Sequence, residues 1–309
     1  MKNGRGCYCH GLLFGLAVLL ILTQAANGAA PMSWVENIRT MKKTIVFLGN
    51  DNDKGQPEFH ASASIIQVNG VLHLLTARHV VSEFKDGRVT GKLIDDALIA
   101  YFNKKDGTIG KRRITDLKKK FGVAWVFHPN MSVDLALIPF SIDENNDDFL
   151  AIPDTYFLGM EGLSELMNVF FVSFQPGVGK ADHVRPLYRP GTVAITFPDK
   201  TYYIDGAAFP GNSGSPVFVR PEPVGFAAKD GPPIFPAQNS GRFIGIIGKY
   251  LPYREVAISS QTGRPRIVFE EHTGLSRVWS TDLVVELTKT SECQNQILRL
   301  TAQTKTNGK

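Results

Sequence analysis

The segment FPGNSGSPV, residues Phe209–Val217, decides how this chain is interpreted. It places Ser213 between small residues on a sharp turn, where glycine allows backbone conformations that other residues avoid. Such a turn leaves the serine hydroxyl accessible and can aim the backbone N–H groups of Gly211 and Ser213 at one point. An acyl-transfer site needs two such donors where its oxyanion forms. A plain hairpin turn has the same composition, so the rest of the chain must decide.

Two segments upstream carry the groups that would activate a serine. Residues 74–81 (LLTARHVV) are predicted to be an apolar strand that ends at His79, and a histidine can take the serine proton near neutral pH. In residues 133–139 (VDLALIP), Asp134 stands at the head of an apolar strand, where a buried carboxylate can bond the histidine Nδ1–H. Alone, His79 could be a core histidine and Asp134 a strand-edge carboxylate. Together with the serine turn, they predict a site for nucleophilic catalysis.

These three motifs resemble those of the chymotrypsin-like serine peptidases. Residues 76–81 (TARHVV) are similar to the Thr-Ala-x-His motif of that family, and residues 134–137 (DLAL) to its Asp-x-Ala-Leu motif. Residues 211–216 (GNSGSP) are similar to Gly-[Asp/Asn]-Ser-Gly-[Gly/Ser]-Pro. The resemblance spans residues 44–290. Within the family, the serine motif with the residues before it resembles bacterial HtrA-type enzymes, and the serine motif also resembles glutamyl endopeptidases.

The resemblance implies a fold and a set of roles. The fold is all-β, with two six-stranded antiparallel β-barrels and a C-terminal helix. His79, Asp134 and Ser213 are expected to form the triad, and the N–H groups of Gly211 and Ser213 the oxyanion hole. The implied activity is hydrolysis of protein or peptide substrates through an acyl-enzyme, without a cofactor. A catalytically silent binding protein that holds a partner in the same cleft is the alternative.

A specificity pocket is implied in the same way. Its walls are expected at Ala207 and Ala208, just before the nucleophile, and at Ile247 and Gly248 on the strand that follows. Because these walls carry no charge, we expect cleavage after small or medium aliphatic residues. Asp205 is the competing possibility, since a carboxylate in the pocket would favour Lys or Arg.

The chain departs from the family in two respects. Asn212 stands where activated digestive proteases carry an aspartate that pairs with a newly cut N-terminal amine, and no activation-type N-terminus follows the leader. We therefore expect a site that forms on folding, without zymogen cleavage. The stretch after Leu287 is too short for the peptide-binding domain of HtrA-type enzymes, so no such domain is expected.

Short apolar runs broken by Gly, Pro, Asn and Asp favour strands over most of the chain. We expect a first barrel within residues 44–160 and a second within residues 165–290. The second ends in a helix that begins at residues 280–282, where Ser280 would be the N-cap. Residues 291–309 are expected to be a polar tail. The strands are predicted at residues 45–48, 63–68, 71–75, 97–102, 124–127, 134–140, 169–174, 191–197, 201–204, 215–219 and 243–247.

The N-terminus carries a targeting signal. Lys2 and Arg5 precede the apolar residues 11–22, and small residues follow at 25–30. The apolar run is shorter than the roughly 20 residues of a membrane span, so residues 1–30 are interpreted as a cleaved secretory signal. An uncleaved anchor is the alternative and would be the only membrane contact. The expected location is secreted or periplasmic.

The cysteine positions predict a mature chain without an internal disulfide. Cys7 and Cys9 lie in the segment that would be removed, which leaves Cys293 as the only cysteine of the mature chain. It therefore cannot close an internal disulfide. We expect a free thiol or an intermolecular partner in the polar tail, and not a nucleophile.

Composition limits the other classes of function. The chain has 309 residues, of which 43% are hydrophobic and 20% charged, as in ordinary globular proteins. The net charge of +5 is modest, so the basic residues at 111–113 and 118–120 are interpreted as a solvated face, and no nucleic acid partner is expected. The histidines outside the motif follow no metal-binding spacing, so no metal is expected. Residues 50–55 lack the late glutamate of a calcium loop.

Overall fold

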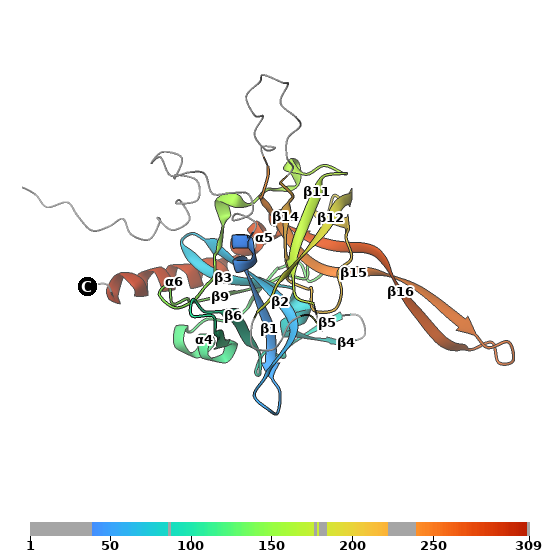
Figure 1. Ribbon diagram of the computed structural model, residues 1–309, viewed down its shortest axis with the longest axis horizontal. Coiled ribbons are helices and arrows are strands. Elements are labelled where there is room, and N and C mark those ends of the chain that lie inside the picture. Colours follow the sequence, from blue (N-terminus) through green and yellow to red (C-terminus); the bar gives the residue numbers. More distant parts are fainter. Residues whose placement is uncertain (1–38, 86–87, 176–177, 179–183, 222–238, 308–309) are drawn as a thin grey trace, which may run out of the picture. The chain divides into compact units, whose positions relative to one another are not determined.

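The computed structural model describes residues 39–85, 88–175, 178, 184–221 and 239–307 (Figure 1). The chain divides into two units, residues 1–40 and residues 41–309, and all of the described strands belong to the second. The predicted secretory signal lies outside the described residues. None of the helices within them is both long and apolar enough to cross a membrane.

An eight-stranded sheet comes first along the chain. Hydrogen bonds join its strands in the order β7-β6-β1-β2-β3-β9-β8, and β10 pairs with β2. All of these pairs are antiparallel except β10 with β2, which is parallel. The strands are β1 (Ile45–Asp51), β2 (Pro57–Val68), β3 (Val71–Thr76), β6 (Ile99–Asn103), β7 (Ile109–Arg113), β8 (Val126–Phe127), β9 (Ala136–Pro139) and β10 (Ile152–Pro153).

The first sheet differs in detail from the expected six antiparallel strands. One addition is β7, whose sequence IGKRR is mostly polar and gives no strand signal. The other is β10, which has two residues and is too short for any alternation to be seen. Because β10 follows a long connection from β9, it can return in the same direction as β2.

The second set of strands forms a closed barrel. Its order is β11-β12-β13-β16-β15-β14, and every pair is antiparallel, so the predicted six-stranded antiparallel barrel is confirmed here. The strands are β11 (Asn168–Ser173), β12 (Leu187–Thr196), β13 (Thr201–Asp205), β14 (Pro216–Val219), β15 (Phe243–Ile258) and β16 (Pro265–Ser280).

Apolar side chains pack into three clusters. Along β1, Ile45 and Phe47 face one cluster while Val46 and Leu48 face another, as expected for a strand that is buried on both faces. One cluster belongs to the first sheet and one to the second barrel. The third joins them, with members from both sets of strands that include Phe47, Leu75, Phe170, Val172 and Trp279.

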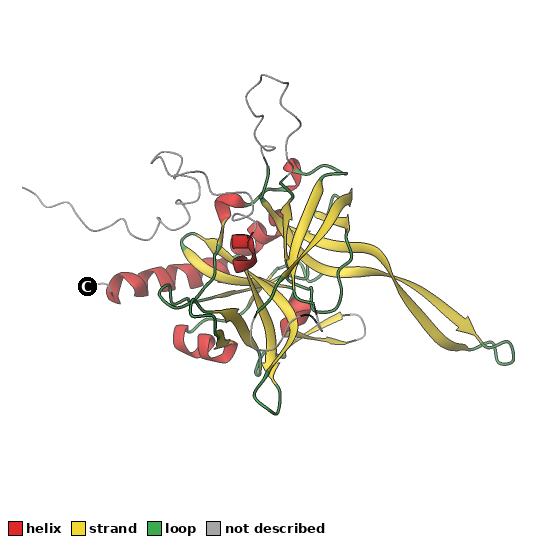
Figure 2. Ribbon diagram, in the orientation of Figure 1, coloured by secondary structure: helices red, strands yellow, loops and turns green. Residues whose placement is uncertain are grey.

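The strands β15 and β16 run far beyond the barrel. β14 pairs with β15 only as far as Ile246, and β13 pairs with β16 only from Leu275 onward. The two long strands continue to pair with each other out to Ile258 and Pro265. Figure 2 shows this pair as a two-stranded ribbon that extends beyond the other strands. The sequence predicted a strand only at 243–247, so this ribbon was missed.

Helices and short turns connect and cover the strands. A small hairpin, β4 (Ser82–Lys85) and β5 (Arg88–Leu93), forms a separate sheet. The predicted C-terminal helix is present as α5, although the Ser280 side chain makes no capping hydrogen bond. The helical elements are η2 (Lys42–Thr44), α3 (Arg78–Val81), α4 (Ile114–Phe121), η3 (Asp154–Tyr156), η4 (Met160–Gly162), α5 (Thr281–Thr288) and α6 (Ser291–Asn307).

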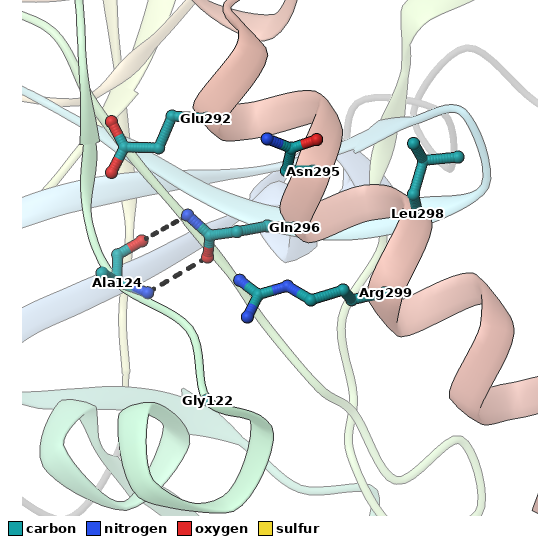
Figure 3. Close-up of a pocket in the computed structure, with 7 residues that line it drawn as sticks. All are labelled: Gly122, Ala124, Glu292, Asn295, Gln296, Leu298 and Arg299. Carbon is teal, nitrogen blue, oxygen red and sulfur yellow. Dashed lines mark hydrogen bonds between the residues drawn. The ribbon is translucent and has the colours of Figure 1, made fainter.

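The expected polar tail is instead the 17-residue helix α6. Cys293, Gln296 and Ile297 are buried, and their spacing of three and four residues gives one buried stripe. The Gln296 amide bonds both backbone groups of Ala124, at 3.1 and 3.2 Å, as Figure 3 shows beside a pocket of about 570 Å³. The helix was not predicted from the sequence because only a narrow stripe of α6 is apolar. Burial, aided by Glu292, raises the pKa of the Cys293 thiol to about 11.

Candidate active site

The fold brings the three motif residues together through one strand pair. β3 and β9 are antiparallel, and Thr76 at the end of β3 faces Ala136 at the start of β9. His79 lies in the single-turn helix α3 just after β3, and Asp134 lies two residues before β9. Adjacent ends of neighbouring strands therefore place the histidine beside the carboxylate. Ser213 comes from the second barrel, on the turn between β13 and β14.

A continuous chain of hydrogen bonds links these side chains. His79 Nδ1 lies 2.7 Å from Asp134 Oδ2, and the His79 backbone N–H donates to Asp134 Oδ1 at 2.8 Å. Because Nδ1 carries the proton towards the carboxylate, Nε2 is left as an acceptor. His79 Nε2 lies 3.0 Å from Ser213 Oγ. The arrangement can remove a proton from a serine hydroxyl, and Ser213 is partly exposed to receive a substrate.

The Ser213 hydroxyl has a second acceptor. Its Oγ lies 3.0 Å from the carbonyl oxygen of Gly248, on β15. A hydroxyl has one proton, so it can donate either to His79 or to Gly248 at a given moment. The Gly248 carbonyl is thus a polar group beside the nucleophile that a bound chain could also use.

The residues before the serine form a tight turn. The Asn212 N–H donates to the Phe209 carbonyl at 2.9 Å, which closes a β-turn with Pro210 and Gly211 at its centre. Gly211 has a φ of 95°, which marks a type II turn, with Pro and Gly at their preferred positions. Type I and type II turns differ by a flip of the central peptide, so the positive φ fixes the direction of the Gly211 N–H. In the described part of the chain, neither this N–H nor that of Ser213 donates to a protein acceptor.

Asn212 locks this turn from inside. The residue is fully buried, and its Oδ1 accepts the Phe209 N–H at 2.8 Å while its Nδ2 donates to the Phe174 carbonyl. A neutral amide therefore acts as acceptor and donor at once. No ion pair is needed to hold the serine turn.

Hydroxyl groups of the first sheet hold the serine turn of the second barrel. The Ser62 N–H donates to the Ser213 carbonyl and the Ser62 hydroxyl to the Gly211 carbonyl, both at 3.0 Å. The Ser64 hydroxyl donates to the Gly214 carbonyl at 3.0 Å. Both serines are fully buried on β2. Their role was not predicted from the sequence, although small hydroxyl residues alternating with alanine inside an apolar strand could have signalled a polar contact.

The predicted pocket residues fall into two groups. Ala208 and Ile247 are buried in the cluster of the second barrel, so their side chains pack inward. Ala207 is partly exposed, and Gly248 presents its carbonyl to Ser213. A Cβ at Gly248 would lie 2.4 Å from Trp279 Nε1, which explains why glycine stands there. Asp205 is exposed at the end of β13, where its carboxylate lies beside Gly274.

Arg78 adds a buried positive charge next to the histidine. It is 5% exposed, its guanidinium lies 4.5 Å from the centre of the Phe127 ring, and Nη1 contacts Met131 Sδ at 3.2 Å. Burial lowers the pKa of the guanidinium, and the negative charge of Asp134 raises it.

Several titratable groups outside this site make structural contacts. Burial lowers the pKa of His73 on β3 to about 4, which keeps that core histidine neutral. In the basic stretches, Arg112 pairs with Asp147 at 2.5 Å and Lys118 with Asp95 at 3.0 Å. Within the described ranges no group of three or more His, Cys, Asp or Glu side chains is placed to hold a metal ion.

Comparison with known proteins places the chain in a family. The family model of the trypsin-like peptidase domain matches residues 61–222, slightly more than half of the chain. Among solved structures, the serine endoprotease from Yersinia pestis is similar, with 15% identity and a TM-score of 0.44 over 86% of this chain and 68% of that one. Deg5 is similar with 14% identity and a TM-score of 0.42, over 69% of this chain and 83% of that one. No curated protein matches. This chain belongs to the trypsin-like peptidase family.

Proposed function

We propose that this protein is a serine endopeptidase that hydrolyses peptide bonds through an acyl-enzyme. The observation that carries the proposal is the unbroken hydrogen-bond chain from Asp134 through His79 to Ser213, at 2.7 and 3.0 Å. Membership of the trypsin-like peptidase family supports it. From the secretory signal predicted at residues 1–30, we propose a secreted or periplasmic enzyme that acts on proteins or peptides.

Each group has one task in this reaction. Ser213 Oγ attacks the scissile carbonyl while His79 Nε2 takes its proton, and Asp134 stabilises the imidazolium that forms. The N–H groups of Gly211 and Ser213 stabilise the oxyanion. His79 then gives the proton to the leaving amine, and a water molecule, activated by the same histidine, releases the acyl group.

The Gly248 carbonyl influences which acceptor receives the proton of the Ser213 hydroxyl. Without substrate, it competes with His79 for the Ser213 proton at the same distance of 3.0 Å. A substrate backbone N–H that bonds Gly248 would remove this competition and direct the hydroxyl to His79. Substrate binding and activation of the serine are then one event.

Labelling with a fluorophosphonate probe distinguishes an active enzyme from a catalytically silent binding protein. Such probes form a covalent bond only with an activated serine, so we expect one label per chain, located at Ser213 by peptide mass mapping. The matched control is Ser213→Ala, which should take no label. Well-folded wild-type protein that remains unlabelled would favour the binding protein and overturn the proposal.

The protein is expected to be active without proteolytic processing. Asn212 is already bonded to neutral backbone groups at Phe209 and Phe174, so no new N-terminal amine is needed to form the turn. Protein expressed without residues 1–30 should show close to one active site per chain in a burst titration. Sites that appear only after a defined internal cut would contradict this and restore a zymogen step.

Cleavage is expected after small or medium aliphatic residues. The predicted pocket walls at Ala207 and Gly248 carry no charge, and each methylene that fits should contribute about 1 to 3 kcal/mol of discrimination. Profiling of cut sites in denatured protein substrates measures this preference. A dominant preference for Lys or Arg would point to Asp205, and one for Glu to a basic group in the pocket.

A further inference from the structure

One histidine outside the triad touches the segment that forms the oxyanion turn. His272 lies on β16, near the base of the ribbon, and its Nε2 lies 2.6 Å from the carbonyl oxygen of Ala208. Ala208 immediately precedes Phe209, the first residue of the turn that orients the Gly211 N–H. The contact therefore joins β16 to the peptide that leads into the active site.

The hydrogen bonds of His272 define its protonation. The Gly274 backbone N–H donates to His272 Nδ1 at 2.8 Å, so Nδ1 must be an acceptor. The proton is then on Nε2, which donates to the Ala208 carbonyl. Only the neutral ring with this tautomer makes both bonds. An imidazolium would set the Nδ1 proton against the Gly274 N–H.

Aromatic rings lie on both sides of the imidazole. The Tyr250 ring stacks on His272 with centroids 4.9 Å apart and an angle of 18°. On the turn side, the Phe209 ring lies 5.3 Å from His272, and the Arg189 guanidinium lies 4.9 Å from the Phe209 ring. Tyr250 is two residues after Gly248, so the stack spans from the strand beside the nucleophile to the oxyanion turn.

A second set of bonds shares the task of holding this segment. The Ser276 hydroxyl accepts the Ala208 N–H at 3.0 Å and donates to the Gly206 carbonyl at 2.6 Å. Ser276 thus holds the amide side of Ala208, and His272 holds its carbonyl side. Both peptide planes that flank Ala208 are anchored to β16.

We infer that His272 is a positioning residue of this active site, which holds the Ala208 carbonyl and so keeps the oxyanion turn in its productive orientation. The inference rests on the proposed peptidase function. If the carbonyl is released, the peptide between Ala208 and Phe209 is held only through its N–H, which donates to Asn212 Oδ1, and the Gly211 N–H is held less firmly in its direction. His272 touches neither the triad nor the reacting atoms.

Two amide substitutions test the inference. In His272→Asn, the shorter side chain can still accept the Gly274 N–H but does not reach Ala208. In His272→Gln, the longer amide can donate to Ala208. We expect H272N to lower kcat about tenfold with a smaller change in KM, because a misplaced oxyanion donor acts in the transition state. H272Q should keep kcat within about twofold of wild type.

The measurements are kcat and KM on a short peptide ester, fluorophosphonate labelling, and the unfolding temperature of each variant. An H272N protein that unfolds like wild type and keeps full kcat would overturn the inference, as would equal losses in H272N and H272Q. If H272N does not fold, a folded H272Q with a tenfold lower kcat overturns it alone. A wild-type chain that takes no label overturns the proposed function itself, and the inference with it.

Discussion

Replacing Ser213 by alanine is expected to abolish peptide hydrolysis, with kcat falling by about 10⁴ to 10⁶. The substitution removes the only oxygen that can attack, while His79 and the oxyanion turn stay in place. Few contacts are lost, because Ser213 Oγ bonds only His79 Nε2 and the Gly248 carbonyl in the described structure. The change in unfolding free energy should therefore be small, within about 1 kcal/mol.

The neighbouring Ser215 supplies the matched control for this prediction. Its hydroxyl is buried and has no hydrogen-bond partner among the described residues, so Ser215→Ala removes the same atom without breaking a bond. Turnover in this variant should stay near that of wild type. Burst kinetics on the two variants, with urea unfolding of each, make the comparison. Near-native turnover by Ser213→Ala would mean that another group is the nucleophile.

Replacing Asn212 by aspartate is expected to damage both the fold and the site at neutral pH. An ionised carboxylate at this position has no N–H to give to the Phe174 carbonyl, so two oxygens would face each other in a fully buried place. An uncompensated buried charge costs about 3 to 5 kcal/mol. Because the charged form is disfavoured in the folded state, the new carboxyl should have a raised pKa.

The sign of the pH dependence follows from that raised pKa. A protonated carboxyl can donate to the Phe174 carbonyl and restore the contact. The unfolding free energy of the variant should therefore be closest to that of wild type at or below about pH 4, the ordinary pKa of an aspartate. Its relative stability should fall as the pH rises from there. Urea unfolding at pH 4 and pH 7.5 measures the difference, with the exposed Asn145→Asp as control. Equal stability at both pH values would show that Asn212 Nδ2 does not hold the turn.

The sequence predicted those site residues that stand in short motifs of chemically reactive residue types. His79, Asp134 and Ser213 each stand in a short motif whose residue types have a chemical reason. Gly211 and Asn212 belong to the same turn, so the oxyanion geometry could also be expected from Pro-Gly. His79 and Asp134 are brought together by the adjacent ends of β3 and β9, and Ser213 by the turn before β14.

The supporting contacts could not be predicted because they depend on distant backbone groups. His272 bonds the carbonyl of Ala208, and Ser62 bonds that of Gly211, 149 residues away in the chain. A backbone carbonyl has no sequence signature. The strand β16 was missed for another reason, since exposed apolar residues such as Ile267, Val268 and Phe269 follow one another without alternation. Alternation of apolar and polar residues indicates only a strand with one solvent-exposed face and one buried face.

The ribbon of β15 and β16 implies a gradient of local opening along a single hairpin. Near the barrel, its strands have neighbours on both sides and residues such as Ile246 and Val278 are fully buried. Farther out, each strand pairs only with the other, and Val256 and Val268 are 46% and 59% exposed. A two-stranded ladder in water is marginally stable, so its amides should exchange with deuterium through local fraying. The amides of residues 275–280, which pair on both sides within the closed barrel, should exchange only on global unfolding. The outer hairpin can therefore open while the barrel stays closed.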